Sequence, residues 1–131
     1  MSISVEAKAR YDRGISFCEQ YMFKGGIGDG AYVAIRRGME EFKTALSIEP
    51  KFHAARLALA DCYFCCPISF SLDPFDAALM YQRVIKEAPE LVVDKEQAST
   101  GNEYLAQSPD KGYEAAVAYR KALNRKPVVW R

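Results

Sequence analysis

The chain has 131 residues, of which 50% are hydrophobic and 27% are charged, so it is long enough to bury about two thirds of its unfolded surface. Lysine and arginine number 18 against 17 aspartates and glutamates, and the two signs are interspersed along the chain. This balance excludes a disordered chain and disfavours nucleic acid and membrane surfaces as partners, because proteins that bind them usually carry a basic excess.

The expected compartment is the cytoplasm. No apolar run approaches the about 20 residues that span a bilayer, and residues 1–6 lack the basic and apolar regions of a signal peptide. Three of the four cysteines, Cys62, Cys65 and Cys66, are crowded on one predicted helix, where neighbouring thiols form a disulfide only with distortion. Reduced thiols agree with a cytoplasmic protein.

Three helices are predicted in the first half of the chain. Residues 5–23 and 31–49 carry apolar side chains at steps of three and four, the pattern of a helix with one buried face. Residues 24–31 are rich in glycine, which predicts a connector between the two helices. A third helix, over residues 52–66, is apolar on nearly all sides and should be covered on both flanks.

The second half predicts three further helices. Asp73 and Pro74 suit the cap and the first turn of a helix that ends near Ala88. A fifth helix, over residues 91–107, has a polar middle and is inferred mainly from the repeat described next. A sixth starts with Ser108-Pro109-Asp110 and is expected to run to about Lys126.

One pattern recurs three times, at residues 42–50, 81–89 and 119–127: an aromatic residue, then polar and apolar residues, then a closing proline. A small residue precedes each aromatic by four places, which puts small, aromatic and apolar side chains on one helical face. These small residues are Gly38, Ala77 and Ala115. Because such a helix cannot bury its apolar stripe alone, the repetition predicts stacked helical hairpins.

The second unit adds Leu59-Ala60-Asp61-Cys62-Tyr63 ahead of Ala77, Tyr81 and Pro89. This combination resembles the tetratricopeptide repeat, with Leu-Gly-x-x-Tyr in the first arm, Ala-x-x-x-Phe in the second, and a closing proline. Gly14 and Phe17 have the separation of the glycine and the aromatic residue in the first-arm motif, so the first unit resembles it there. No Leu-Gly-x-x-Tyr can be read near Asn102.

The resemblance implies an all-α fold, a right-handed superhelical stack of three antiparallel helical hairpins. It implies a single domain, 1–131, with units at about 5–50, 51–89 and 90–127 and a short tail, 128–131.

In similar proteins the first arms line a concave groove that holds an extended peptide or a partner helix. The resemblance therefore implies a non-catalytic scaffold for protein–protein interaction, with no cofactor. The residues expected to line the groove are Tyr11, Ile15, Leu57, Asp61, Phe64 and Tyr104. Some relatives clamp a carboxylate with lysine and asparagine at places that here hold Tyr11, Ile15 and Asp61, so an apolar ligand segment is favoured.

Self-association is a further expectation from the resemblance. Many relatives end in an additional capping helix, whereas this sequence stops soon after Trp130. The outer face of the sixth helix would then be partly uncovered, and we expect a weak homodimer there. The residues expected at that contact are Tyr113, Ala116, Leu123 and Trp130.

Two alternative functions stay open. Cys18 with the cluster at Cys62, Cys65 and Cys66 could offer thiolates to zinc or an iron–sulfur cluster, although buried structural cysteines are favoured. A small-molecule sensor would instead use the connectors at residues 24–31 and 67–72 to close over the groove.

Catalysis and phosphate binding are disfavoured. Residues 26–30 are glycine-rich and precede a helix with Arg36 and Arg37, but they follow a helix and lack the Gly-Lys-Ser/Thr ending of a nucleotide loop. His53, the only histidine, has no recognisable nucleophile or acid arranged beside it in the sequence.

Overall fold

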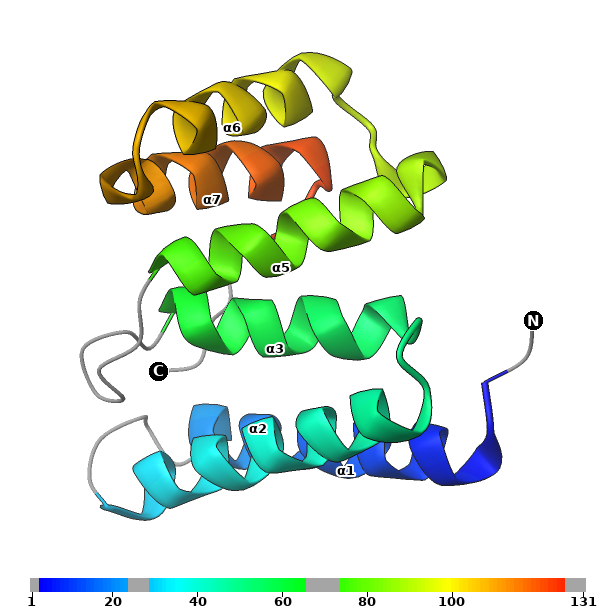
Figure 1. The fold of residues 1–131 in the computed structure, drawn as a ribbon. Helices are drawn as coiled ribbons and strands as arrows, with labels where there is room; N and C mark the ends of the chain where they lie inside the picture. The colour runs from blue at the N-terminus through cyan, green and yellow to red at the C-terminus, as the bar shows by residue number, and fades with distance from the viewer. Residues whose placement is uncertain (1–2, 24–28, 66–73, 127–131) are drawn as a thin grey trace. The chain divides into compact units, whose positions relative to one another are not determined.

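The computed structural model describes residues 3–23, 29–65 and 74–126, and these residues form helices, turns and short linkers with no β-strand among them. The predicted all-α fold is confirmed for this part of the chain. Its α-helices are α1 (Val5–Phe23), α2 (Asp29–Ile48), α3 (His53–Cys65), α5 (Pro74–Glu87), α6 (Lys95–Gln107) and α7 (Gly112–Ala122), and its 3₁₀ helices are η1 (Pro89–Leu91) and η2 (Pro109–Lys111) (Figure 1).

Two units divide the chain, and the division falls within α3. The first unit contains α1, α2 and α3 as far as Cys62, and the second begins at Tyr63 and contains α5, α6 and α7. Within the residues that the structure describes, no helix is both long enough and apolar enough to cross a membrane.

Glycine allows the close approach of α1 and α2, which run antiparallel in the first unit (Figure 1). A methyl group built on Gly14 would lie 2.5 Å from Cε1 of Phe42, and one built on Gly38 would lie 2.9 Å from Sγ of Cys18. Phe42 and Cys18 are buried. The small and aromatic residues of the first repeat therefore mark the contact between its two helices.

The first unit is closed at one end by α3. Phe52 and Ala55 pack with Ala7 of α1 and Ala45 of α2 in one buried cluster. The turn between α2 and α3 contains Pro50, and α2 ends at Ile48, one residue before the predicted end at Glu49. At its other end α2 begins at Asp29, earlier than predicted, so Asp29 and Gly30 belong to the helix. The remainder of the glycine-rich connector, residues 24–28, lies outside the described residues.

The fifth predicted helix forms as α6, with a later start than expected. Asp94 has an extended backbone, and its side chain accepts a hydrogen bond from the Gln97 amide at 3.2 Å, which caps the helix. The amides of Val93 and Asp94 both donate to the carbonyl of Ala122, at 2.8 and 3.3 Å. The linker before α6 is thereby tied to the end of α7.

Gly101 in α6 repeats the arrangement of the first unit. A methyl group on Gly101 would lie 2.6 Å from Cδ1 of Tyr119, whose side chain is fully buried. No complete Leu-Gly-x-x-Tyr lies near Asn102, as the sequence indicated, but Gly101 and Tyr104 keep the Gly-x-x-Tyr part of the pattern. The leucine of the motif is replaced by Thr100.

The sixth predicted helix is shorter than expected. It opens with η2, where Ser108 accepts a hydrogen bond from the Asp110 amide at 3.1 Å, and continues as α7. It ends at Ala122 and not near Lys126, because Asn124 adopts the left-handed conformation with φ of 53°. The amide of Arg125 then donates to the carbonyl of Arg120 at 2.8 Å, which terminates the helix.

We predict that Gly101→Ala lowers the free energy of unfolding, although alanine favours an isolated helix by about 1 kcal/mol. The new methyl group would collide with the ring of Tyr119, and overpacking of this kind costs about 1–3 kcal/mol. Chemical denaturation measures the change. Ser99→Ala, at an exposed position of α6, is the control and should leave stability unchanged or slightly raised. A Gly101→Ala protein as stable as Ser99→Ala would contradict the packing.

Candidate functional site

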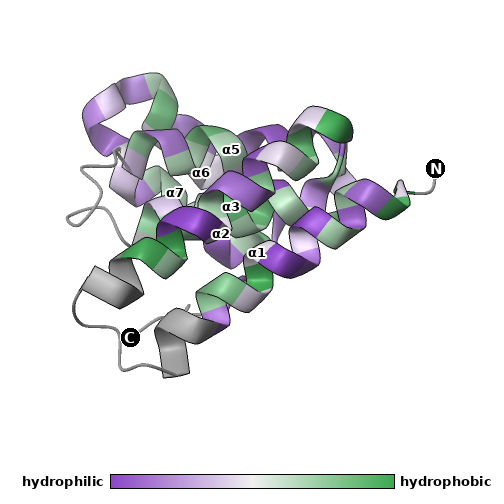
Figure 2. Ribbon diagram, turned by 90° about the horizontal axis from the view of Figure 1, so that it is seen from below, coloured by the Kyte–Doolittle hydropathy of each residue, from purple (hydrophilic) through white to green (hydrophobic). Residues whose placement is uncertain are grey.

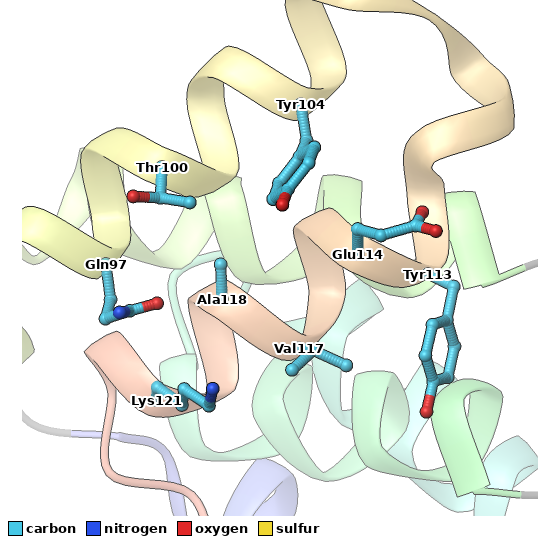
Figure 3. Close-up of a pocket in the computed structure, with 8 residues that line it drawn as sticks. All are labelled: Gln97, Thr100, Tyr104, Tyr113, Glu114, Val117, Ala118 and Lys121. Carbon is cyan, nitrogen blue, oxygen red and sulfur yellow. The ribbon is translucent and has the colours of Figure 1, made fainter.

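A pocket of about 330 Å³ lies between α6 and α7 in the second unit (Figure 3). We call it the α6–α7 pocket. It is lined by Gln97, Thr100 and Tyr104 from α6 and by Tyr113, Glu114, Val117, Ala118 and Lys121 from α7.

The lining of the α6–α7 pocket follows helical spacing. Gln97, Thr100 and Tyr104 are three and four residues apart and so share one face of α6, and the ring of Tyr104 extends from that face toward α7 (Figure 3). On α7, Val117 and Ala118 supply apolar surface. With Tyr113 included, the pocket therefore combines two aromatic rings, three hydroxyl groups and a small apolar surface.

Tyr113, at the start of α7, is held in place although 57% of it is exposed. Its ring stacks on that of Phe64, with centroids 5.6 Å apart and planes inclined by 13°. An aromatic pair in this geometry gains about 0.5–1.5 kcal/mol beyond the area that it buries. The exposed tyrosine is thus preorganised by a neighbour within its own unit.

Phe64 also contacts a buried cation, Arg120. The guanidinium carbon lies 4.9 Å from the centre of the Phe64 ring and 5.8 Å from that of Tyr81. Arg120 is only 7% exposed, and its guanidinium donates hydrogen bonds to the Tyr81 hydroxyl and to the carbonyl of Lys126. These contacts stabilise a charge that would otherwise be costly to bury.

Glu114 and Lys121 place opposite charges in the α6–α7 pocket, on one face of α7. Glu114 lies in the first turn of α7, where the helix dipole favours a negative charge. Its Oε2 atom is buried and accepts no hydrogen bond from any residue that the structure describes. One carboxylate oxygen of a pocket-lining residue therefore has no hydrogen-bond donor among the described residues.

A hydrogen-bond network joins the three helices of the second unit beside this pocket. The hydroxyl of Tyr119 donates to Oδ1 of Asn102 at 2.6 Å, and Nε2 of Gln82 donates to the Tyr119 hydroxyl at 3.0 Å. Burial raises the pKa of the Tyr119 hydroxyl above its ordinary value of 10.0, and the hydrogen bond from Gln82 offsets part of the rise.

Four of the predicted groove residues belong to the first unit. Tyr11 is half-buried, and its ring centre lies 5.9 Å from that of Phe42 and 5.2 Å from that of Phe52. Ile15 is also half-buried. Leu57 and Asp61 are 8% and 3% exposed, which leaves almost no surface with which to line an open groove.

The other two predicted groove residues lie in the second unit. Tyr104 lines the α6–α7 pocket, and Phe64 supports the Tyr113 ring at its edge. Sequence reasoning missed Gln97, Thr100, Glu114 and Lys121. Their spacing relative to Tyr104 and Tyr113 is a signal that could have identified them, but polar residues at such positions are also ordinary on exposed helix faces.

The predicted self-association residues do not share one exposed surface. Tyr113 is exposed, but Ala116 is fully buried and Leu123 is 9% exposed, because their side chains point into the packed interior. Trp130 lies outside the described residues. Ala116 and Leu123 therefore expose little or no surface with which to contact a second chain.

The positions of the cysteines are relevant to the alternative function as a metal-binding protein. Cys18 and Cys62 are free thiols in buried positions, while Cys66 and the side chain of Cys65 lie outside the described residues. Across residues 3–23, 29–65 and 74–126, no three His, Cys, Asp or Glu side chains gather closely enough to hold a metal ion. His53 is half-buried at the first position of α3. The connector at residues 67–72 also lies outside the described residues.

Comparison of the chain with protein-family models, with curated proteins and with solved structures yields no match.

Tyr119 should make stability depend on pH above about 10. Because its pKa is raised in the folded state, its contribution is complete below the ordinary value of 10.0 and is lost as the pH rises through the folded value. We predict that Tyr119→Phe lowers stability at pH 7 by about 1 kcal/mol through the lost hydrogen bonds. The difference from the wild type should narrow above pH 10, as denaturation at several pH values would measure. A constant difference up to pH 12 would contradict this.

Arg120 and Tyr81 should be energetically coupled. We expect Arg120→Met to lower the free energy of unfolding by about 1–3 kcal/mol, since it removes a hydrogen bond to the buried Tyr81 hydroxyl. In a double-mutant cycle with Tyr81→Phe, a coupling energy of at least about 0.5 kcal/mol is expected. Additive effects of the two substitutions would show that the contact contributes nothing to stability.

Proposed function

We propose that this chain is a non-catalytic helical-repeat scaffold of the tetratricopeptide type, and that it binds a segment of another protein at the α6–α7 pocket. The repeated aromatic, small and proline residues support the family assignment. The Gly14–Phe42 and Gly101–Tyr119 contacts support it further, since the same small-against-aromatic packing occurs in both units.

The observation that carries the proposal is an exposed aromatic ring with a fixed orientation. Tyr113 keeps 57% of its surface exposed while Phe64 holds its ring by stacking. Tyrosine is among the residues that contribute most to binding energy at protein interfaces. A side chain that is already ordered loses little conformational entropy when a partner covers it. Tyr113 therefore suits a partner contact.

The α6–α7 pocket adds the means to select a partner. Its volume of about 330 Å³ accommodates one or two side chains of a bound segment. Tyr104, Val117 and Ala118 supply surface for an apolar side chain, and Glu114 and Lys121 supply charges that fix its direction. An apolar residue flanked by polar groups is the expected binding motif.

The test uses peptides selected from a random displayed library on the immobilised wild-type chain. We predict that Tyr113→Ala weakens binding of the selected peptides at least about tenfold, which corresponds to about 1.4 kcal/mol. Fluorescence polarisation measures the affinity, and thermal unfolding checks that the variant is folded. Glu103→Ala, an exposed position on α6 outside the pocket lining, is the control and should bind normally.

Two results would contradict this proposal. Peptides that bind Tyr113→Ala and the wild type equally would place the contact elsewhere. Thermal shifts produced by small metabolites and abolished by Tyr113→Ala, in the absence of any selectable peptide, would favour the small-molecule sensor instead.

A further inference from the structure

A second pocket, of about 580 Å³, lies between α1 and α2 in the first unit. We call it the α1–α2 pocket. Its α1 side consists of Arg13 and Phe17, and its α2 side consists of Val33, Arg36, Arg37, Glu40 and Glu41. Hydrophilic and hydrophobic residues alternate along both helices (Figure 2).

The negative charges of the α1–α2 pocket are already neutralised by neighbours. Oε1 of Glu41 lies 3.4 Å from Arg10 and 3.7 Å from Arg13. Oε1 of Glu40 lies 3.5 Å from Nζ of Lys43. The two carboxylates therefore do little to cancel the remaining positive charges of the pocket.

Arg36 and Arg37 supply those remaining charges. Both are exposed, and within the described part of the chain neither guanidinium has a carboxylate partner. The guanidinium of Arg37 instead lies 6.0 Å from the centre of the Phe17 ring. An arginine pair of this kind favours carboxylates, because each guanidinium can donate two parallel hydrogen bonds to one.

Apolar surface lies beside the arginine pair. Val33 is 45% exposed and lies on the same face of α2 as Arg36 and Arg37, and half-buried Phe17 faces them from α1. A phosphate backbone binds through charge alone and would not cover the apolar surface of Val33 and Phe17. A short peptide can cover this apolar surface, because it can place an apolar side chain next to acidic ones.

We infer that the α1–α2 pocket binds an acidic segment of a partner protein, in which a bulky apolar residue is flanked by aspartate or glutamate. Arg36 and Arg37 pair with the carboxylates, and Phe17 and Val33 contact the apolar side chain. Nucleic acid fits this site less well, since its phosphate backbone would leave the exposed apolar surface of Val33 uncovered and the whole chain carries a net charge of only +1. The inference rests on the proposed function only in that the chain binds protein segments.

The test uses a labelled peptide, acetyl-Glu-Glu-Leu-Phe-Glu-Glu-amide, with a matched peptide in which every Glu is Gln. We expect the acidic peptide to bind the wild-type chain at least about tenfold more tightly than the Gln peptide, and its affinity to fall as salt is raised. Arg36→Gln/Arg37→Gln should weaken binding of the acidic peptide about tenfold. Both positions are exposed, and thermal unfolding checks that the variant is folded.

Two control variants make the result specific. Lys86→Gln/Lys95→Gln removes the same charge from exposed positions of the second unit and should leave acidic-peptide binding unchanged. Tyr113→Ala should also leave it unchanged, so that loss at the α6–α7 pocket and loss at the α1–α2 pocket can be told apart.

Four results would overturn the inference: no binding of the acidic peptide, equal binding of the Gln peptide, equal weakening by the lysine control, or tighter binding of a single-stranded oligonucleotide or an anionic vesicle at matched salt. Failure of the library selection alone would count against the α6–α7 pocket and not against this one.

Discussion

The spacing of the paired helices in each unit is set by one contact. A glycine on one helix lies against the ring of an aromatic residue on the other. Gly14 meets Phe42 in the first unit, and Gly101 meets Tyr119 in the second. Both rings are fully buried. A side chain of any size at either glycine would force the two backbones apart, so the rest of the packing depends on these positions.

This spacing also determines what the surface can offer. Gly101 and the network of Gln82, Asn102 and Tyr119 fix α6 against α7, so the pocket-lining residues on the two helices have set positions. Arg120 helps to fix the position of Tyr113, because its guanidinium lies over the Phe64 ring on which Tyr113 stacks. The candidate site is therefore supported by residues outside its lining, of which Gly101, Tyr119 and Arg120 are buried.

The amino-acid pattern predicted the all-α fold of the described residues and most of their helix boundaries, because periodic apolar residues and prolines act locally. It predicted less well where a boundary depends on distant contacts. Lys95 begins α6 because Asp94 caps the helix and its amide is hydrogen-bonded to the end of α7. Asn124 ends α7 through a backbone conformation that composition does not reveal. Gly101 was overlooked because its partner, Tyr119, is distant in sequence.

The candidate site was less predictable than the fold. Tyr104 and Phe64 could be chosen from repeat positions, but burial of Leu57, Asp61, Ala116 and Leu123 depends on three-dimensional packing. Glu41 pairs with Arg10 and Arg13, and Glu40 pairs with Lys43. These ion pairs, which leave Arg36 and Arg37 without a carboxylate partner among the described residues, also depend on side-chain geometry. Charge counts along a sequence do not distinguish paired from unpaired charges.

The mid-helix glycines have a consequence for how the chain acquires its structure. Glycine weakens an isolated helix, so α6, with its polar composition and Gly101 at its centre, has little tendency to form alone. We therefore expect its residues to become helical when Tyr119 packs against the glycine. Ordering of α6 and docking against α7 should thus be a single cooperative event, and a fragment that ends before α7 would leave residues 95–107 largely uncoiled.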